Sequence, residues 1–170
     1  MGYYVSGEGW LRIKNENLPA AYEALMALND APAEAKRGGS WGGGVEGRTA
    51  AWFSWMPADL RTIPTTQDVF RELGFEVEVD GKTGDVLIGH YDNKTGQEDV
   101  FFAAAAPFIE DGEYEWQGED GEFWKWQFVG GKMFHVSGTR SYSHASLVEP
   151  LALLADESAM TKRVAEMFTK

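Results

Sequence analysis

The chain contains no cysteine among its 170 residues. Disulfide bonds, a thiolate nucleophile and cysteine-ligated zinc are therefore excluded. Basic residues are also few, with 15 lysines and arginines against 27 aspartates and glutamates and a formal charge of −12. Binding to the phosphates of a nucleic acid requires concentrated positive charge, so this balance argues against a nucleic-acid partner.

Long hydrophobic runs are missing as well. The longest, residues 100–109, is shorter than the roughly 20 residues that cross a bilayer. The chain also does not open with the basic and apolar regions of a secretory signal. Hydrophobic residues make up 44% and aromatic residues 14%, which is enough to bury a core. We therefore expect a cytoplasmic globular protein without a membrane contact.

Alternating hydrophobicity and turn residues predict a sheet of short antiparallel strands. The expected strands cover residues 3–13, 75–79, 86–91, 113–117, 123–129 and 132–139. Apolar residues at helical spacing predict helices that begin at Asn17, Thr65 and Gln97, and a further one from Ser146. The order of these elements predicts an α+β fold with a single antiparallel sheet, a C-terminal β-meander and helices mainly on one face.

Local signals refine this prediction. Gly7 and Gly9 indicate a bulge or a close backbone approach in the first strand. Thr65 and Asp68 resemble a capping box, and Gly74 is a natural C-cap for the same helix. Both ends of that helix are therefore predicted by specific residues.

The chain is expected to have two regions. Residues 1–142 would form the α+β domain, and residues 143–170 would form a helical C-terminal extension with leucines in register. The extension would pack either against the sheet or against another copy of the chain, which would make the protein a homo-oligomer.

No residue pattern assigns a catalytic site, a metal or a cofactor. His90, His135 and His144 lie in separate segments without the spacing of metal ligands or of a catalytic pair. The Walker phosphate-binding pattern is absent. Residues 92–96 resemble a calcium loop only loosely and are expected to form a turn. We therefore expect a protein that is not an enzyme.

Acidic residues are concentrated in the segment 110–122, which holds seven acids and no lysine or arginine. Such a segment suits a cation site, a DNA-mimicking stripe or a surface that steers a basic partner. The simpler explanation, which the charge pattern alone favours, is a solvated hairpin whose charges prevent edge-to-edge pairing. The candidate partner-binding residues are Glu113, Glu115, Trp116, Glu119, Asp120 and Glu122, with Trp116 as an exposed anchor.

A second candidate site lies in the loop from residue 36 to 61. Six glycines fall within residues 36–49, and arginines and tryptophans are interleaved along the loop. Such residues can stack on and clamp an anionic aromatic ligand such as a nucleotide. The commoner role of the tryptophans would be to anchor the loop to the core. The candidate ligand-binding residues are Arg37, Trp41, Arg48, Trp52 and Trp55.

Four segments, residues 1–5, 52–56, 91–98 and 116–121, carry a resemblance to small proteins encoded by phages of actinobacteria. The resemblance covers about residues 1–142 and assigns no activity to any residue. It implies a setting in the cytoplasm of a bacterial host, where small acidic phage proteins act on host proteins, including defence systems.

Two hypotheses follow. The first is a non-enzymatic phage-type accessory protein that binds a bacterial host protein and inhibits or redirects it through the acidic segment. The alternative is a protein that binds or sequesters a nucleotide-like small molecule through the loop 36–61.

Overall fold

The computed structural model describes residues 2–38 and 50–141. The chain divides into two units, Met1–Thr139 and Arg140–Lys170, and nearly all described residues belong to the first. The expected helical extension, residues 143–170, lies outside the described residues, as does the contact between copies that it would form. Within the described part, no helix is long and apolar enough to cross a membrane.

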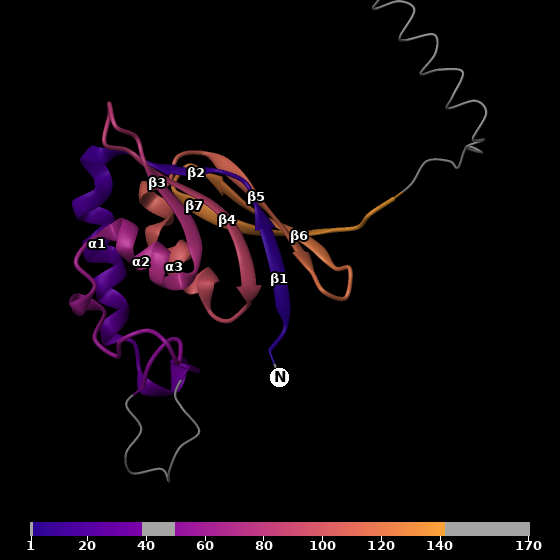
Figure 1. Ribbon diagram of the computed structural model, residues 1–170, viewed down its shortest axis with the longest axis horizontal. Helices are drawn as coiled ribbons and strands as arrows, with labels where there is room; N and C mark the ends of the chain where they lie inside the picture. The colour runs from indigo at the N-terminus through magenta and orange to yellow at the C-terminus, as the bar shows by residue number, and fades with distance from the viewer. Residues whose placement is uncertain (1, 39–49, 142–170) are drawn as a thin grey trace, which may run out of the picture. The chain divides into compact units, whose positions relative to one another are not determined.

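A seven-stranded antiparallel sheet organises the first unit (Figure 1). Its strands are β1 Tyr4–Glu8, β2 Leu11–Ile13, β3 Phe75–Val79, β4 Val86–Lys94, β5 Gly112–Gly118, β6 Phe123–Val129 and β7 Lys132–Gly138. The order across the sheet is β2-β4-β1-β5-β6-β7, and β3 pairs with β4 as well. The last three strands form the expected β-meander, because each pairs with the next along the chain.

β1 and β2 are two parts of one interrupted strand, and both pair with β4. The interruption falls at Gly9, whose φ of 146° is readily adopted only by glycine. A Cβ atom there would lie 2.9 Å from the carbonyl oxygen of Glu113 on β5, so the backbones approach closely at this point. The irregularity expected in the first strand is confirmed.

Three helices lie on the same side of the sheet (Figure 1). They are α1 Leu18–Met26, α2 Thr66–Leu73 and α3 Glu98–Ala105. The expected α+β architecture, with one antiparallel sheet and helices on one face, is therefore confirmed. We call the opposite side of the sheet the open face, since no helix of the described residues covers it.

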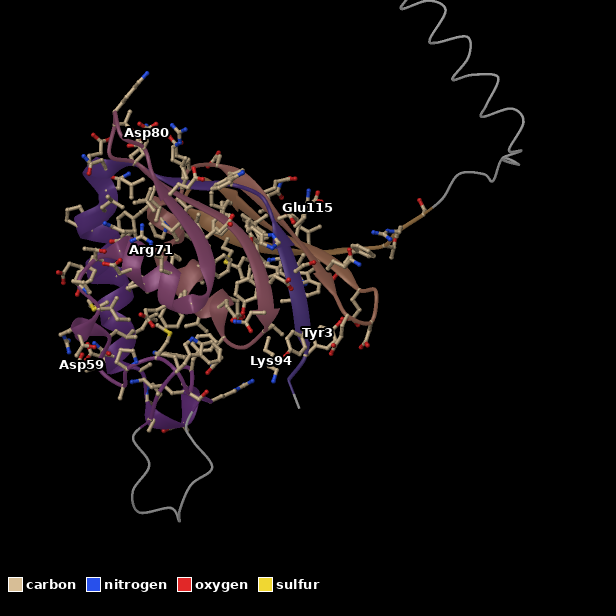
Figure 2. All side chains as sticks on the ribbon, viewed as in Figure 1. Tyr3, Asp59, Arg71, Asp80, Lys94 and Glu115 are labelled. Atoms are coloured by element: carbon tan, nitrogen blue, oxygen red, sulfur yellow. The ribbon has the colours of Figure 1, made fainter. Side chains whose placement is uncertain are left out.

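The core fills the space between the sheet and the helices, and it is strongly aromatic (Figure 2). Phe102 on α3 lies at its centre, with ring centroids 4.9 Å from Phe75, 5.0 Å from Phe70 and 5.0 Å from Trp126. These rings meet at tilted angles, which aromatic pairs prefer over direct stacking. Strands from both halves of the sheet and two of the helices are joined through this one residue.

Both predicted ends of α2 are confirmed. The Thr65 hydroxyl accepts a hydrogen bond from the backbone N–H of Asp68 at 3.2 Å, as an N-cap residue does. Gly74 ends the helix with a φ of 103°, in the left-handed conformation typical of a C-cap.

Two other expectations need correction. Residues 92–94 were expected to begin a turn, but they extend β4 because β1 provides a hydrogen-bonding partner for them. The helix expected over residues 97–109 ends at Ala105, and a 3-10 turn covers Ala106–Phe108. Pro107 explains the early end, since proline supplies no backbone N–H and clashes with the preceding helical turn.

Candidate functional site

The candidate acidic residues divide between a strand and a turn. Glu113 and Glu115 are exposed on β5, on the open face, and Glu115 projects away from the helices (Figure 2). Glu113 accepts hydrogen bonds from Lys125 Nζ at 2.7 Å and from Gln127 Nε2 at 3.0 Å, both on β6. Part of its charge is thus balanced by the neighbouring strand, whereas Glu115 is aligned with Glu8 on β1 and with Lys125 on β6.

Glu119, Asp120 and Glu122 lie in the turn between β5 and β6, and all three are exposed. The turn is closed by hydrogen bonds from the backbone N–H groups of Gly118 and Gly121. A Cβ atom at Gly118 would collide with the Tyr3 side chain, so the start of the turn requires glycine. These three carboxylates extend the acidic surface beyond the end of the strands.

Trp116 does not belong to this surface. Its side chain is only 3% exposed, and it points from β5 toward the helices. Its ring lies 4.7 Å from that of Trp126 and 5.4 Å from that of Tyr91, measured between centroids. The expectation of an exposed anchor at Trp116 is therefore wrong. The strand alternation that places Glu113 and Glu115 outward places Trp116 inward, so the sequence contained the signal for this correction.

Other aromatic residues occupy the open face. Trp10 is 53% exposed, and Tyr4 and Phe134 are each 48% exposed. Ring atoms of Trp10 fill the position that a Cβ atom at Gly89 would take, so this indole packs against β4. Sequence analysis did not select these residues. Only the pairing of β1, β2 and β4 shows that Trp10 lies beside a glycine 79 positions further along the chain.

A row of side chains crosses the open face from β4 to β7. Strand pairing aligns Glu8 with Glu115, Glu115 with Lys125, and Lys125 with Val136. At the end of the row, His90 Nδ1 lies 3.0 Å from Glu8 Oε1. Along this row the open face carries ionisable side chains, with an apolar side chain, Val136, at its β7 end.

The histidines do not converge. His90 pairs with Glu8, whereas His135 stacks near Trp124 on the other side of the sheet, and His144 lies outside the described residues. Across residues 2–38 and 50–141, no group of three or more histidines and carboxylates is placed to hold a metal ion.

The loop from residue 36 to 61 keeps only part of its proposed ligand site. Arg37 is exposed, and its backbone N–H donates to the side-chain oxygen of Gln97 at 2.8 Å. Trp55 is 48% exposed, and its indole N–H donates to the carbonyl oxygen of Glu72 at 2.9 Å. Trp41 and Arg48 lie outside the described residues.

The structure contradicts the predicted role of Trp52 in that candidate site. It is 5% exposed, and its ring meets that of Phe101 edge to face at 5.8 Å. A ligand has no access to the face of this indole for stacking. Trp52 anchors the loop to the core, which is the commoner role considered for these tryptophans.

No protein-family model, curated protein or solved structure matches this chain. The resemblance to phage proteins therefore stays a prediction.

Proposed function

We propose that this chain is a non-enzymatic, phage-type accessory protein that binds a bacterial host protein through its open face and inhibits or redirects it. One observation carries the proposal: the open face combines exposed Trp10, Tyr4 and Phe134 with acidic side chains, and no helix of the described residues covers it.

The aromatic side chains supply the binding energy in this proposal. An antiparallel sheet can leave one face in water when the outward positions are polar. Here the outward positions of β6 and β7 include the exposed apolar residues Val129, Phe134 and Val136. Tryptophan and tyrosine are the residues that most often dominate protein interfaces. Large exposed apolar side chains on an uncovered sheet face are a feature of interaction sites.

The acidic side chains determine the kind of partner. Glu115 lies on the open face, and Glu119, Asp120 and Glu122 continue the negative charge past the end of β5. The chain as a whole carries a formal charge of −12. A partner with a basic surface would be attracted over a distance and oriented before contact. The resemblance of residues 1–142 to phage proteins supports a host protein in the bacterial cytoplasm as that partner.

A capture experiment tests the aromatic contribution. The full chain is immobilised beside the variant Trp10→Ser/Phe134→Ser, and proteins retained from bacterial lysate are quantified by mass spectrometry. The control, Trp55→Ser/Val79→Ser, removes apolar side chains of similar exposure elsewhere, since Trp55 and Val79 are each 48% exposed. We expect one protein at near-stoichiometric yield on the wild type and the control, and its loss on the open-face variant. Equal retention on both variants would reject the open face as the interface.

A charge-reversal experiment on the purified pair tests the acidic contribution. Glu119, Asp120 and Glu122 are changed together to lysine, and association rates are measured at low and high salt. The control reverses three exposed acids on the helix side of the molecule, Glu16, Glu23 and Glu34, so the change in net charge is the same. We expect a slowing of association, about tenfold or more at low salt, only in the first variant. Equal association rates for the two variants would show that these three carboxylates do not steer the partner.

A further inference from the structure

A pocket of about 200 Å³ lies on the helix side of the sheet, where the start of α3 meets β5, β6 and β7. Trp116, Trp124, Trp126 and His135 line it from the sheet, and Glu98 and Asp99 line it from α3. Two larger hollows beside α1 contain a single aromatic side chain, Tyr22. The concentration of tryptophan therefore distinguishes the pocket at α3, which we call the tryptophan pocket.

The rings of the tryptophan pocket lie in two orientations. Trp116 and Trp124 are nearly parallel, with an interplanar angle of 8° and centroids 6.0 Å apart. His135 continues this row at 6.4 Å from Trp124. Trp126 stands at 64° to Trp116, with centroids 4.7 Å apart. Trp124 is partly exposed and His135 is exposed, so these two rings are open to a group that enters the pocket, whereas Trp116 and Trp126 are buried. The face of a tryptophan attracts cations more strongly than that of any other side chain.

A buried carboxylate lies in the wall of the pocket. Glu98 is 2% exposed. Its oxygens accept hydrogen bonds from the Tyr91 hydroxyl at 2.9 Å, the Gly96 N–H at 2.7 Å and the Thr95 hydroxyl at 3.3 Å. These three donors hold the carboxylate in one position. Asp99 is exposed and accepts from the Val100 N–H at 3.0 Å, which leaves capacity on its carboxylate for a ligand.

The charges of the pocket disfavour an anion. A helix N-terminus ordinarily attracts anions through its free N–H groups. In the first turn of α3, however, the Val100 N–H donates to the Asp99 carboxylate, and the N–H of Gly96, two residues before the helix, donates to the Glu98 carboxylate. An anionic ligand would meet two carboxylates and aromatic faces. A cation would meet favourable electrostatics from both.

We propose that the tryptophan pocket binds an alkylated ammonium group, either as a free ion such as choline or as the end of an alkylated lysine side chain. The pocket is smaller than the roughly 300–1,000 Å³ of sites for drug-sized ligands, so a small head group fits it better than a whole metabolite. This inference is independent of the proposed function, because the pocket and the open face lie on opposite sides of the sheet.

The test follows the tryptophan indole N–H signals by NMR during titration with choline. Its neutral carbon isostere, 3,3-dimethylbutan-1-ol, is titrated in parallel, and sodium chloride controls for ionic strength. We expect saturable shifts for Trp116, Trp124 and Trp126, no saturable shift for Trp10 and Trp55, and at least about tenfold weaker binding of the neutral alcohol. Equal affinity for choline and the alcohol would show an apolar hollow and overturn the proposal.

Two variants locate the site. Trp124→Ala removes a wall, and Asp99→Asn removes a charge from an exposed position without a change of shape, so it remains informative if the first variant does not fold. Trp10→Ala, on the open face, is the matched control. We expect choline affinity to fall about tenfold in Trp124→Ala, less in Asp99→Asn, and not at all in the control. Unchanged affinity in both pocket variants would reject the site.

A short peptide that carries trimethyllysine distinguishes the two sources of the ammonium group. Affinity for the peptide at least tenfold above that for choline would assign a protein side chain as the ligand, and comparable or lower affinity would assign a free ion. Failure of both probes to bind would overturn the proposal.

Discussion

The Tyr114 hydroxyl on β5 donates a hydrogen bond to the carbonyl oxygen of Gly89 on β4, at 2.7 Å in the buried interior. β1 lies between these two strands, and its Gly7 leaves the space that the Tyr114 side chain occupies. The bond therefore joins strands that are not neighbours in the sheet.

We expect Tyr114→Phe to lower the free energy of unfolding by about 1–2 kcal/mol, because it removes the donor from a buried carbonyl group. The measurement is urea unfolding at neutral pH. Tyr4→Phe removes an exposed hydroxyl and should change the free energy little. Equal losses in the two variants would show that the buried hydrogen bond contributes no net stability.

Stability should also fall at alkaline pH. Burial raises the pKa of Tyr114 above its ordinary value of 10.0, and burial together with the nearby Glu98 carboxylate does the same for the pKa of Tyr91. Above pH 10 the unfolded chain loses these protons while the folded chain keeps them. The stabilisation is therefore fully present below about pH 10 and is lost as the pH rises, by about 1.4 kcal/mol per pH unit for each tyrosine.

Unfolding measured from about pH 9 to about pH 11 checks this, since both sides of the ordinary tyrosine pKa are sampled. Tyr114→Phe should show a shallower decline than the wild type, because one of the two buried tyrosines no longer titrates. An identical slope would mean that Tyr114 ionises in the folded protein as readily as in water.

The N-cap of α2 gives a prediction at acidic pH. The hydrogen bond from the Thr65 hydroxyl, and then the neighbouring Arg71, lower the pKa of Asp68 below its ordinary value of 3.8. The resulting stability is present above about pH 4 and is lost as the pH falls through the lowered pKa. Thr65→Ala should cost about 1 kcal/mol at neutral pH and flatten the acid branch of the stability curve.

Thr65→Ser keeps the hydroxyl and serves as the matched variant. It should retain both the stability and the acid dependence of the wild type. A loss in Thr65→Ser as large as that in Thr65→Ala would show that packing of the threonine methyl group, and not the cap, is responsible.

The contact between Trp10 and Gly89 predicts a local change on the open face. A Cβ atom at Gly89 would lie 2.6 Å and 2.7 Å from two ring atoms of Trp10, so Gly89→Ala must move the indole. We expect a shifted Trp10 indole N–H signal in NMR spectra and weaker capture of the host partner. Gly81→Ala is the control, because a Cβ atom there has no other atom within 4 Å. An unmoved Trp10 signal in Gly89→Ala would contradict the contact.

Local physical chemistry accounts for the parts of the fold that were predicted correctly. Gly9 interrupts a strand through its own backbone conformation, and Thr65 and Gly74 end a helix through bonds within one or two turns. Such features depend on residues close together in the chain. The predictions at residues 92–94 and 106–109 failed for different reasons. Residues 92–94 form a strand because β1, from the other end of the chain, pairs with them. The prediction of a helix over residues 106–109 did not allow for Pro107, which ends the helix before it.

The candidate sites were predicted less well, because exposure is decided by what covers a side chain. Trp52 and Trp116 were selected from charge and aromatic spacing, yet both are buried. Alternation along β5 separates Trp116 from its acidic neighbours, so that error was avoidable. Nothing near Trp10 in the chain indicates that a distant glycine leaves room for its ring.

The sequence by itself determined the fold class, the acidic charge and the exclusion of cysteine chemistry, because composition and short-range periodicity are properties of the chain alone. Only the tertiary structure decided which aromatic residues face solvent and which enclose the tryptophan pocket. That pocket joins the start of α3 to three strands that follow it in the chain. Its formation depends on the helices covering one face of the sheet, which leaves the other face open.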